Sequence, residues 1–111
     1  MRFFESGKLD HLGGKWNLEK GEFDLIGLQE PADFKFKGEL DYVCGGSILA
    51  RREVFETIGL LEPAFFLFWE DADFCMRAKK AGFGIGICHE ARLWHKVSAS
   101  FNGGKPHVAY F

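Results

Sequence analysis

The segment FFLFWEDADFCMRAKKAGF, residues Phe65 to Phe83, decides the fold class because it is the most clearly periodic stretch of the chain. Phe74, Ala78 and Ala81 recur at i, i+4 and i+7 and would place one apolar stripe along a helix. Two lysines fall in the last turn, where the helix dipole favours positive charge, and Gly82 is suited to end the helix. The spacing therefore predicts a helix that starts at the acidic run and ends at Gly82.

Three carboxylates stand at the start of that helix, directly behind an aromatic run. Acidic side chains in a first turn accept hydrogen bonds from free backbone N–H groups and suit the helix dipole, so a helix cap is one interpretation. A second interpretation is a general base mounted on a rigid helix start. At 100° per residue, Glu70 and Asp71 point to the core side, whereas Asp73 points away and can pair with Arg77 four residues on. The aromatic residues are Phe65, Phe66, Phe68 and Trp69.

The rest of the chain predicts short strands, one further helix and many turns. Residues 1–40 carry glycines between short apolar pieces, which suits short strands or irregular loops rather than a long helix. Residues 52–58 predict a helix that ends at Gly59. Apolar or alternating runs predict short strands at residues 40–44, 47–50, 85–88 and 92–95. We therefore expect one mixed α/β domain over residues 1–111, with a short mixed sheet and two main helices.

Composition argues against several functional classes. The chain of 111 residues has a formal net charge of −2 and no run of more than two basic residues, so nucleic acid is not expected as its partner. No apolar run approaches the length of a membrane span, and the N-terminus lacks the apolar region of a signal peptide. Three cysteines without a C-x-x-C motif favour reduced thiols that fill space in or near the core. These features predict a cytoplasmic protein.

Two further features could contribute to a site. Gly45 and Gly46 follow an expected strand, where glycines let a backbone approach a ligand closely but also make ordinary turns. His95 ends an apolar stretch, and such a histidine serves either as a structural side chain or as a ligand. A zinc site is a further alternative, although the spacing of its residues matches no familiar zinc finger. Its residues would be Cys75, Cys88, His89 and His95.

The region Asp41 to Ser100 resembles the C-terminal half of the catalytic domain of family 2 glycosyltransferases, especially the rhamnosyltransferase-like and galactofuranosyltransferase-like members. The shared features are an ordered series of short motifs, whereas residues 1–40 resemble only loosely the variable acceptor-side region of these enzymes. In order, the motifs are Gly45-Gly46, RREVFETIG, an aromatic run, Trp69-Glu70-Asp71, the helix end RAKKAG, and Trp94-His95.

The resemblance implies a partial GT-A fold, which is Rossmann-like, and transfer of a sugar with inversion from a nucleotide-diphosphate-sugar to a glycan acceptor hydroxyl. It implies that Asp71 is the base that deprotonates the acceptor, and that Glu70 and Trp69 help bind the acceptor. Gly45 and Gly46 would lie beside the two sugars. His95 would complete a site for Mg²⁺ or Mn²⁺ close to Asp71, and the aromatic run would exclude water. Such enzymes build cell-surface polysaccharides and glycans, so the parent protein is expected in the cytoplasm or at the inner face of the membrane.

Some features of the family pattern are missing. No D-x-D motif, which grips the metal and the diphosphate in the family, stands before Asp41, and Glu62 and His89 replace the usual Asp and Pro. We therefore expect a fragment that lacks the donor site, binds no metal and transfers no sugar alone. An exposed sheet edge would favour a homo-oligomer. The alternatives are a non-catalytic binding or oligomerisation module derived from that fold, and a small metal-binding protein that uses His89 and His95.

Overall fold

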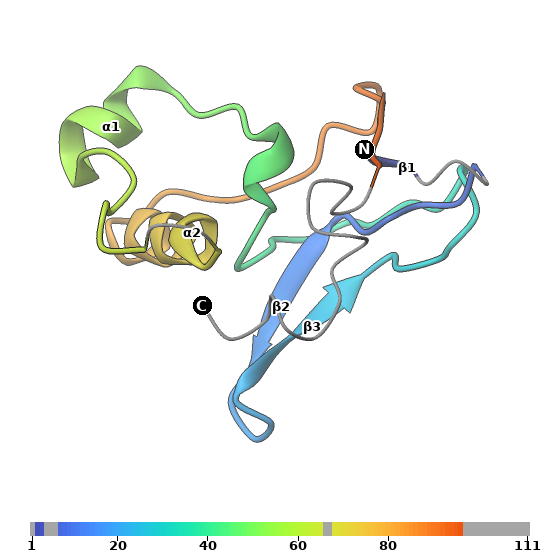
Figure 1. Cartoon of the computed structure of the whole chain (residues 1–111), viewed down its shortest axis with the longest axis horizontal. Helices are drawn as coiled ribbons and strands as arrows, with labels where there is room; N and C mark the ends of the chain where they lie inside the picture. The colour runs from blue at the N-terminus through green and yellow to red at the C-terminus, as the bar shows by residue number, and fades with distance from the viewer. Residues whose placement is uncertain (1, 4–6, 66–67, 97–111) are drawn as a thin grey trace.

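A computed structural model describes residues 2–3, 7–65 and 68–96 of the chain, and the described elements are of the mixed α/β class. In Figure 1 the two helices lie together on one side, and the antiparallel hairpin extends away from them. The elements are β1 (Arg2–Phe3), β2 (Gly13–Asn17), β3 (Glu22–Ile26), the short 3-10 helix η1 (Gly45–Ser47), α1 (Arg52–Ile58), α2 (Glu70–Lys80) and β4 (Leu93–Trp94).

Both expected helices are confirmed, and each ends as its sequence predicts. The backbone turns at Gly59 with φ of 81° and at Gly82 with φ of 96°, a conformation that glycine adopts without steric cost. The N–H of Gly59 bonds to the carbonyl of Phe55, which closes the last turn of α1. On α2 two residues of the predicted apolar stripe, Phe74 and Ala78, are buried. The third, Ala81, is exposed because the helix ends at Lys80.

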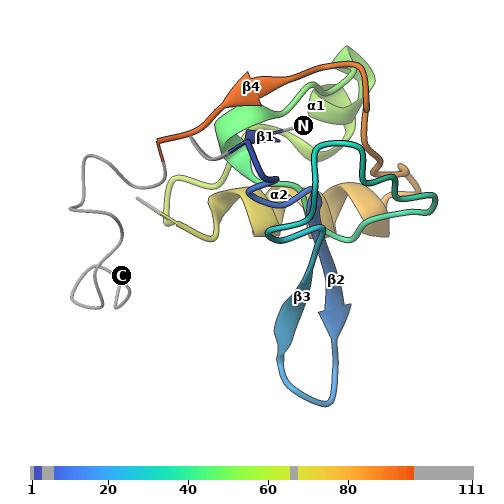
Figure 2. The ribbon, with the colours of Figure 1, turned by 90° about the vertical axis from the view of Figure 1, so that its right-hand side faces the viewer.

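The strands form two separate pairs instead of the expected mixed sheet. The β2–β3 hairpin is antiparallel and pairs Gly13 with Ile26 at one end and Asn17 with Glu22 at the other. Strand β4 pairs in parallel with β1, so chain segments from the two ends of the described region lie side by side. Figure 2 shows the hairpin projecting beyond the rest of the described chain, with its turn farthest from the helices.

Three of the expected strands are wrong, at residues 40–44, 47–50 and 85–88. A strand needs a continuous ladder of backbone hydrogen bonds, and among the described residues these segments form no such ladder. Tyr42 forms one isolated bridge with Gly14, and the N–H of Leu40 bonds to the carbonyl of Ile85. Of the expected strand at 92–95, only the part assigned to β4 is observed.

Two small apolar clusters hold the described elements together. One joins α1 to α2 through Val54, Phe74 and Ala78. The other surrounds Leu9 and Leu12, which are packed against side chains of the hairpin and of residues 32–36 and 87. The first cluster packs the buried face of α2 against α1, which fixes the position of α2.

A candidate active site at the start of helix α2

Helix α2 begins at a strained turn. Phe68 and Trp69 both have positive φ angles, 65° and 68°, which cost free energy for residues with a Cβ atom. The helix nevertheless starts regularly, because the N–H of Asp73 bonds to the carbonyl of Trp69 at 2.9 Å. This turn points the chain directly into α2 and sets the direction of the acidic residues that follow.

Asp71 links the start of α2 to the η1 turn. Its Oδ2 accepts the N–H of Gly45 at 2.7 Å, and its Oδ1 accepts the N–H of Ala72 at 2.8 Å. A Cβ atom built on Gly45 would lie 3.2 Å from the Cβ of Asp71, so glycine permits the close approach. A carboxylate has about four acceptor positions, and two remain after these bonds. Asp71 therefore satisfies one backbone N–H in the first turn of α2 and is also a fixed, half-buried acceptor.

Glu70 has one oxygen without a partner. Its Oε2 is enclosed, yet no described residue donates a hydrogen bond to it. A buried acceptor in this state is costly and binds a hydroxyl or water donor readily. The expected contrast between Glu70 and Asp71 on one side and Asp73 on the other is not seen in their burial, because all three residues are half-buried.

Asp73 has a structural role. Its Oδ2 accepts the Nε–H of Arg77 at 2.9 Å, which confirms the predicted pair. Arg77 also donates to the carbonyls of Ile58 and Leu60, at 2.6 and 2.9 Å, just where α1 ends. The guanidinium thus satisfies the orphan carbonyl of Ile58 at the end of α1 and that of Leu60 just after it, which links the two helices.

The expectation that the aromatic run excludes water stays a prediction. Phe65, Phe68 and Trp69 are exposed, with Trp69 retaining 56% of its surface, and Phe66 lies outside the described residues. The three described rings precede α2 in the chain and contribute exposed apolar surface.

His95 is paired with an acid that the sequence did not single out. Its Nδ1 lies 2.8 Å from Oδ2 of Asp10, whose side chain is only 7% exposed. The sequence contains a hint that Asp10 has a partner. It lies between Leu9 and Leu12, and an acidic side chain in a buried segment needs a hydrogen-bond or charge partner. No hydrogen bond joins His95 to Asp71, so their expected proximity stays a prediction.

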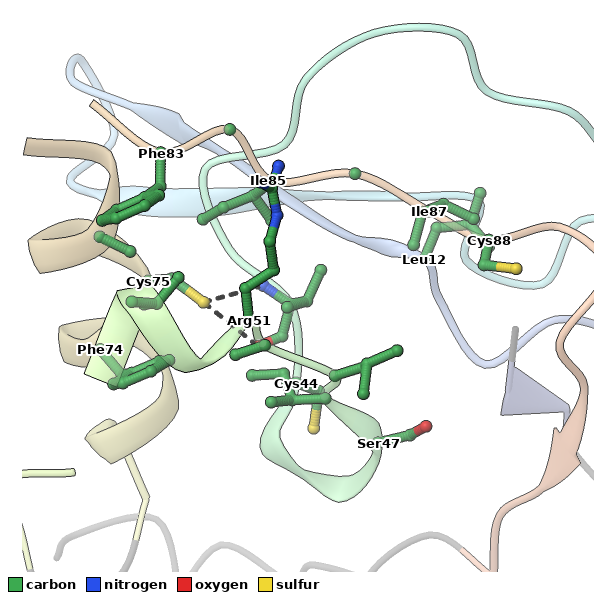
Figure 3. A pocket seen from close by; sticks show the side chains of 18 of the residues that line it. Leu12, Cys44, Ser47, Arg51, Phe74, Cys75, Phe83, Ile85, Ile87 and Cys88 are labelled. Atoms are coloured by element: carbon green, nitrogen blue, oxygen red, sulfur yellow. Dashed lines mark hydrogen bonds between the residues drawn. The ribbon is translucent and has the colours of Figure 1, made fainter. Parts of the chain in front are cut away.

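A cavity of about 490 Å³ adjoins the η1 turn, between the helices and residues 83–91 (Figure 3). Phe74 and Cys75 line one side in that view, and Ile87 and Cys88 line the other. The thiol of Cys75 contacts the backbone of Val43, and its pKa is raised chiefly by burial. The cavity is mainly apolar, and Asp71 lies outside its lining.

The four side chains of the zinc alternative have different partners. Cys75 bonds to Val43, Cys88 to Glu90, and Nε2 of His89 lies 3.1 Å from the carbonyl oxygen of Phe36. Over residues 7–65 and 68–96, no three His, Cys, Asp or Glu side chains converge on a metal-sized space. The described part of the chain does not assemble a zinc centre from these residues.

The Mg²⁺ or Mn²⁺ that the resemblance implies could find one ligand in His95. A carboxylate partner at one ring nitrogen is the usual arrangement behind a metal-binding histidine, and Asp10 supplies it.

Comparison of the chain with protein-family models, curated proteins and solved structures finds no match. Within the described residues, none of the helices has the length and apolar character needed to cross a membrane.

Proposed function

We propose that this chain is the acceptor-side part of an inverting family 2 glycosyltransferase, with Asp71 as the base. The observation that carries the proposal is the 2.7 Å bond between Gly45 N–H and Asp71 Oδ2. It joins two motifs of the family resemblance that lie 26 residues apart in the sequence. An ordinary helix cap requires no such partner from a distant turn.

The arrangement suits removal of a proton from a sugar hydroxyl. A hydroxyl is a weak nucleophile at neutral pH, so a positioned base must take its proton as it attacks the anomeric carbon. Asp71 has acceptor positions left for that proton, and its two backbone bonds fix its orientation. The unpartnered Oε2 of Glu70 could accept a second hydroxyl of the acceptor and so orient it.

The other parts of the proposal follow from the resemblance. The donor would be a nucleotide-diphosphate-sugar, the domain would have the GT-A fold, and the product would be a cell-surface polysaccharide or glycan. A bound Mg²⁺ or Mn²⁺ supplies charge that stabilises the leaving diphosphate. The exposed rings of Phe68 and Trp69, which directly precede the acidic run in the chain, could stack on an acceptor sugar.

The test compares two matched substitutions in a form of the protein that includes a nucleotide-binding half. Asp71→Asn should lower kcat by about 10² to 10⁴-fold, the usual contribution of a general base, without weakening donor binding. Asp73→Asn makes the same chemical change two residues away, on a carboxylate occupied by Arg77, and should keep kcat within a few fold. Near-normal turnover by Asp71→Asn would remove the base assignment.

A further inference from the structure

The pair formed by Asp10 and His95 connects parts of the chain that lie 85 residues apart. Asp10 is the one buried charged or polar residue of the described chain, with 5% of its surface exposed. Its backbone is held in place by the preceding residue, because the N–H of Leu9 bonds to the carbonyl of Glu30 and the carbonyl of Leu9 accepts the N–H of Gln29. The carboxylate is therefore mounted on a fixed support.

The direction of the hydrogen bond determines the form of the imidazole ring. An ionised carboxylate can only accept, so the Nδ1 of His95 must carry the proton that joins the pair. In the neutral ring, the lone pair is then on Nε2. No described residue bonds to that atom, and about a third of the His95 side chain is exposed.

We propose that Asp10 is a positioning residue that holds His95 in the Nδ1–H form, so that Nε2 presents its lone pair to a ligand. The tautomer and its dependence on Asp10 follow from the geometry alone. The identity of the ligand, a divalent cation bound to a diphosphate, rests on the proposed function. Buried carboxylates commonly fix a histidine in this way, and replacing such an acid by its amide reverses the tautomer while keeping the shape.

His89 provides an internal control. Its Nε2 lies 3.1 Å from the carbonyl oxygen of Phe36, and a carbonyl only accepts hydrogen bonds. His89 should therefore carry its proton on Nε2, the opposite form to His95. One spectrum of one sample can show both forms side by side.

The experiment is ¹⁵N NMR of the imidazole rings, at a pH where the spectrum shows both rings neutral. For His95 the Nε2 signal should have the chemical shift of an unprotonated nitrogen. For His89 the Nδ1 signal should have that shift instead. In Asp10→Asn the amide can donate to Nδ1, so the His95 pattern should reverse while His89 stays unchanged. Amide shifts of the β2–β3 hairpin report whether the variant is folded.

Several results would overturn the proposal. A wild-type spectrum with the His95 proton on Nε2 would overturn the proposal, even if the variant failed to fold. An unchanged His95 tautomer in folded Asp10→Asn would also overturn it. In the transfer-competent form, Asp10→Asn should raise the Mn²⁺ concentration for half-maximal activity by about 10 to 100-fold. If folded Asp10→Asn needed no more Mn²⁺ than wild type, the ligand of His95 would not be the divalent cation. The proposed function is tested separately, by the turnover of Asp71→Asn.

Discussion

The ion pair between Asp41 and Lys79 should contribute strongly to stability, because it fastens the hairpin to α2. Lys79 Nζ donates to one carboxylate oxygen of Asp41, and the backbone N–H of Trp16 donates to the other at 2.8 Å. The side chains of Asp41 and Lys79 are only 17% and 25% exposed. Asp41→Asn removes the charge with almost no change of shape, so its effect reports the electrostatic contribution of this connection.

The expected cost is intermediate between those of exposed and buried ion pairs. Exposed pairs contribute about 0 to 1 kcal/mol, and hydrogen bonds to charged groups about 1.5 to 3 kcal/mol. For a pair with this partial burial we expect Asp41→Asn to cost about 2 kcal/mol, which in a chain of this size lowers Tm by roughly 8 °C. Urea denaturation at pH 7 measures the change. Glu56→Gln is the control, because its ion pair with Arg52 is long and exposed, and it should change stability little.

The same pair predicts a pH dependence. Burial raises the pKa of Asp41, but the hydrogen bonds from Lys79 and Trp16 lower it by more, so it lies below the ordinary carboxyl value. A carboxyl with a lowered pKa in the folded state stabilises fully above its unfolded pKa, near 4, and loses that contribution as pH falls. The stability gap between wild type and Asp41→Asn should therefore narrow below about pH 5. A gap that is absent at pH 7, or constant down to pH 3, would refute this account.

Two further predictions concern α2. Arg77→Lys keeps the charge but loses the planar fork that bonds two carbonyls at the end of α1, so it should cost roughly 2 kcal/mol in urea denaturation; an unchanged midpoint would contradict that role. Cys75 should react with a disulfide reagent much more slowly than Cys88, because burial raises the pKa of its thiol whereas Cys88 is exposed. Mass spectrometry of partly labelled protein measures the order, and equal rates for the two thiols would contradict it.

The helices could be predicted because their signals are local. The apolar stripe, the Asp73–Arg77 pair and the closing glycines each consist of residues close together in the sequence. The pair and the glycines are found where expected, and so is the stripe except for Ala81, which is exposed after the helix end. The strands at 40–44, 47–50 and 85–88 could not be predicted in this way. An apolar run shows only that a segment suits a strand, and a distant partner must complete the ladder. Leu49 illustrates the failure, since this residue of an expected strand is fully exposed.

The same distinction applies to the candidate site. Asp71, His95 and Gly45 stand out in the sequence, but Asp10 does not. Neither pairing could be predicted, because the partners lie 26 and 85 residues apart. From the sequence, a helix cap and a general base are compatible explanations of the acidic run, because a helix start is a rigid place for a base. In the structure Asp71 accepts the N–H of Ala72 in the first turn of α2, and it also accepts the N–H of Gly45 in η1, a bond that the helix does not need. If capping were its whole purpose, that second bond would be superfluous, and Asp71→Asn would change stability without a specific loss of turnover.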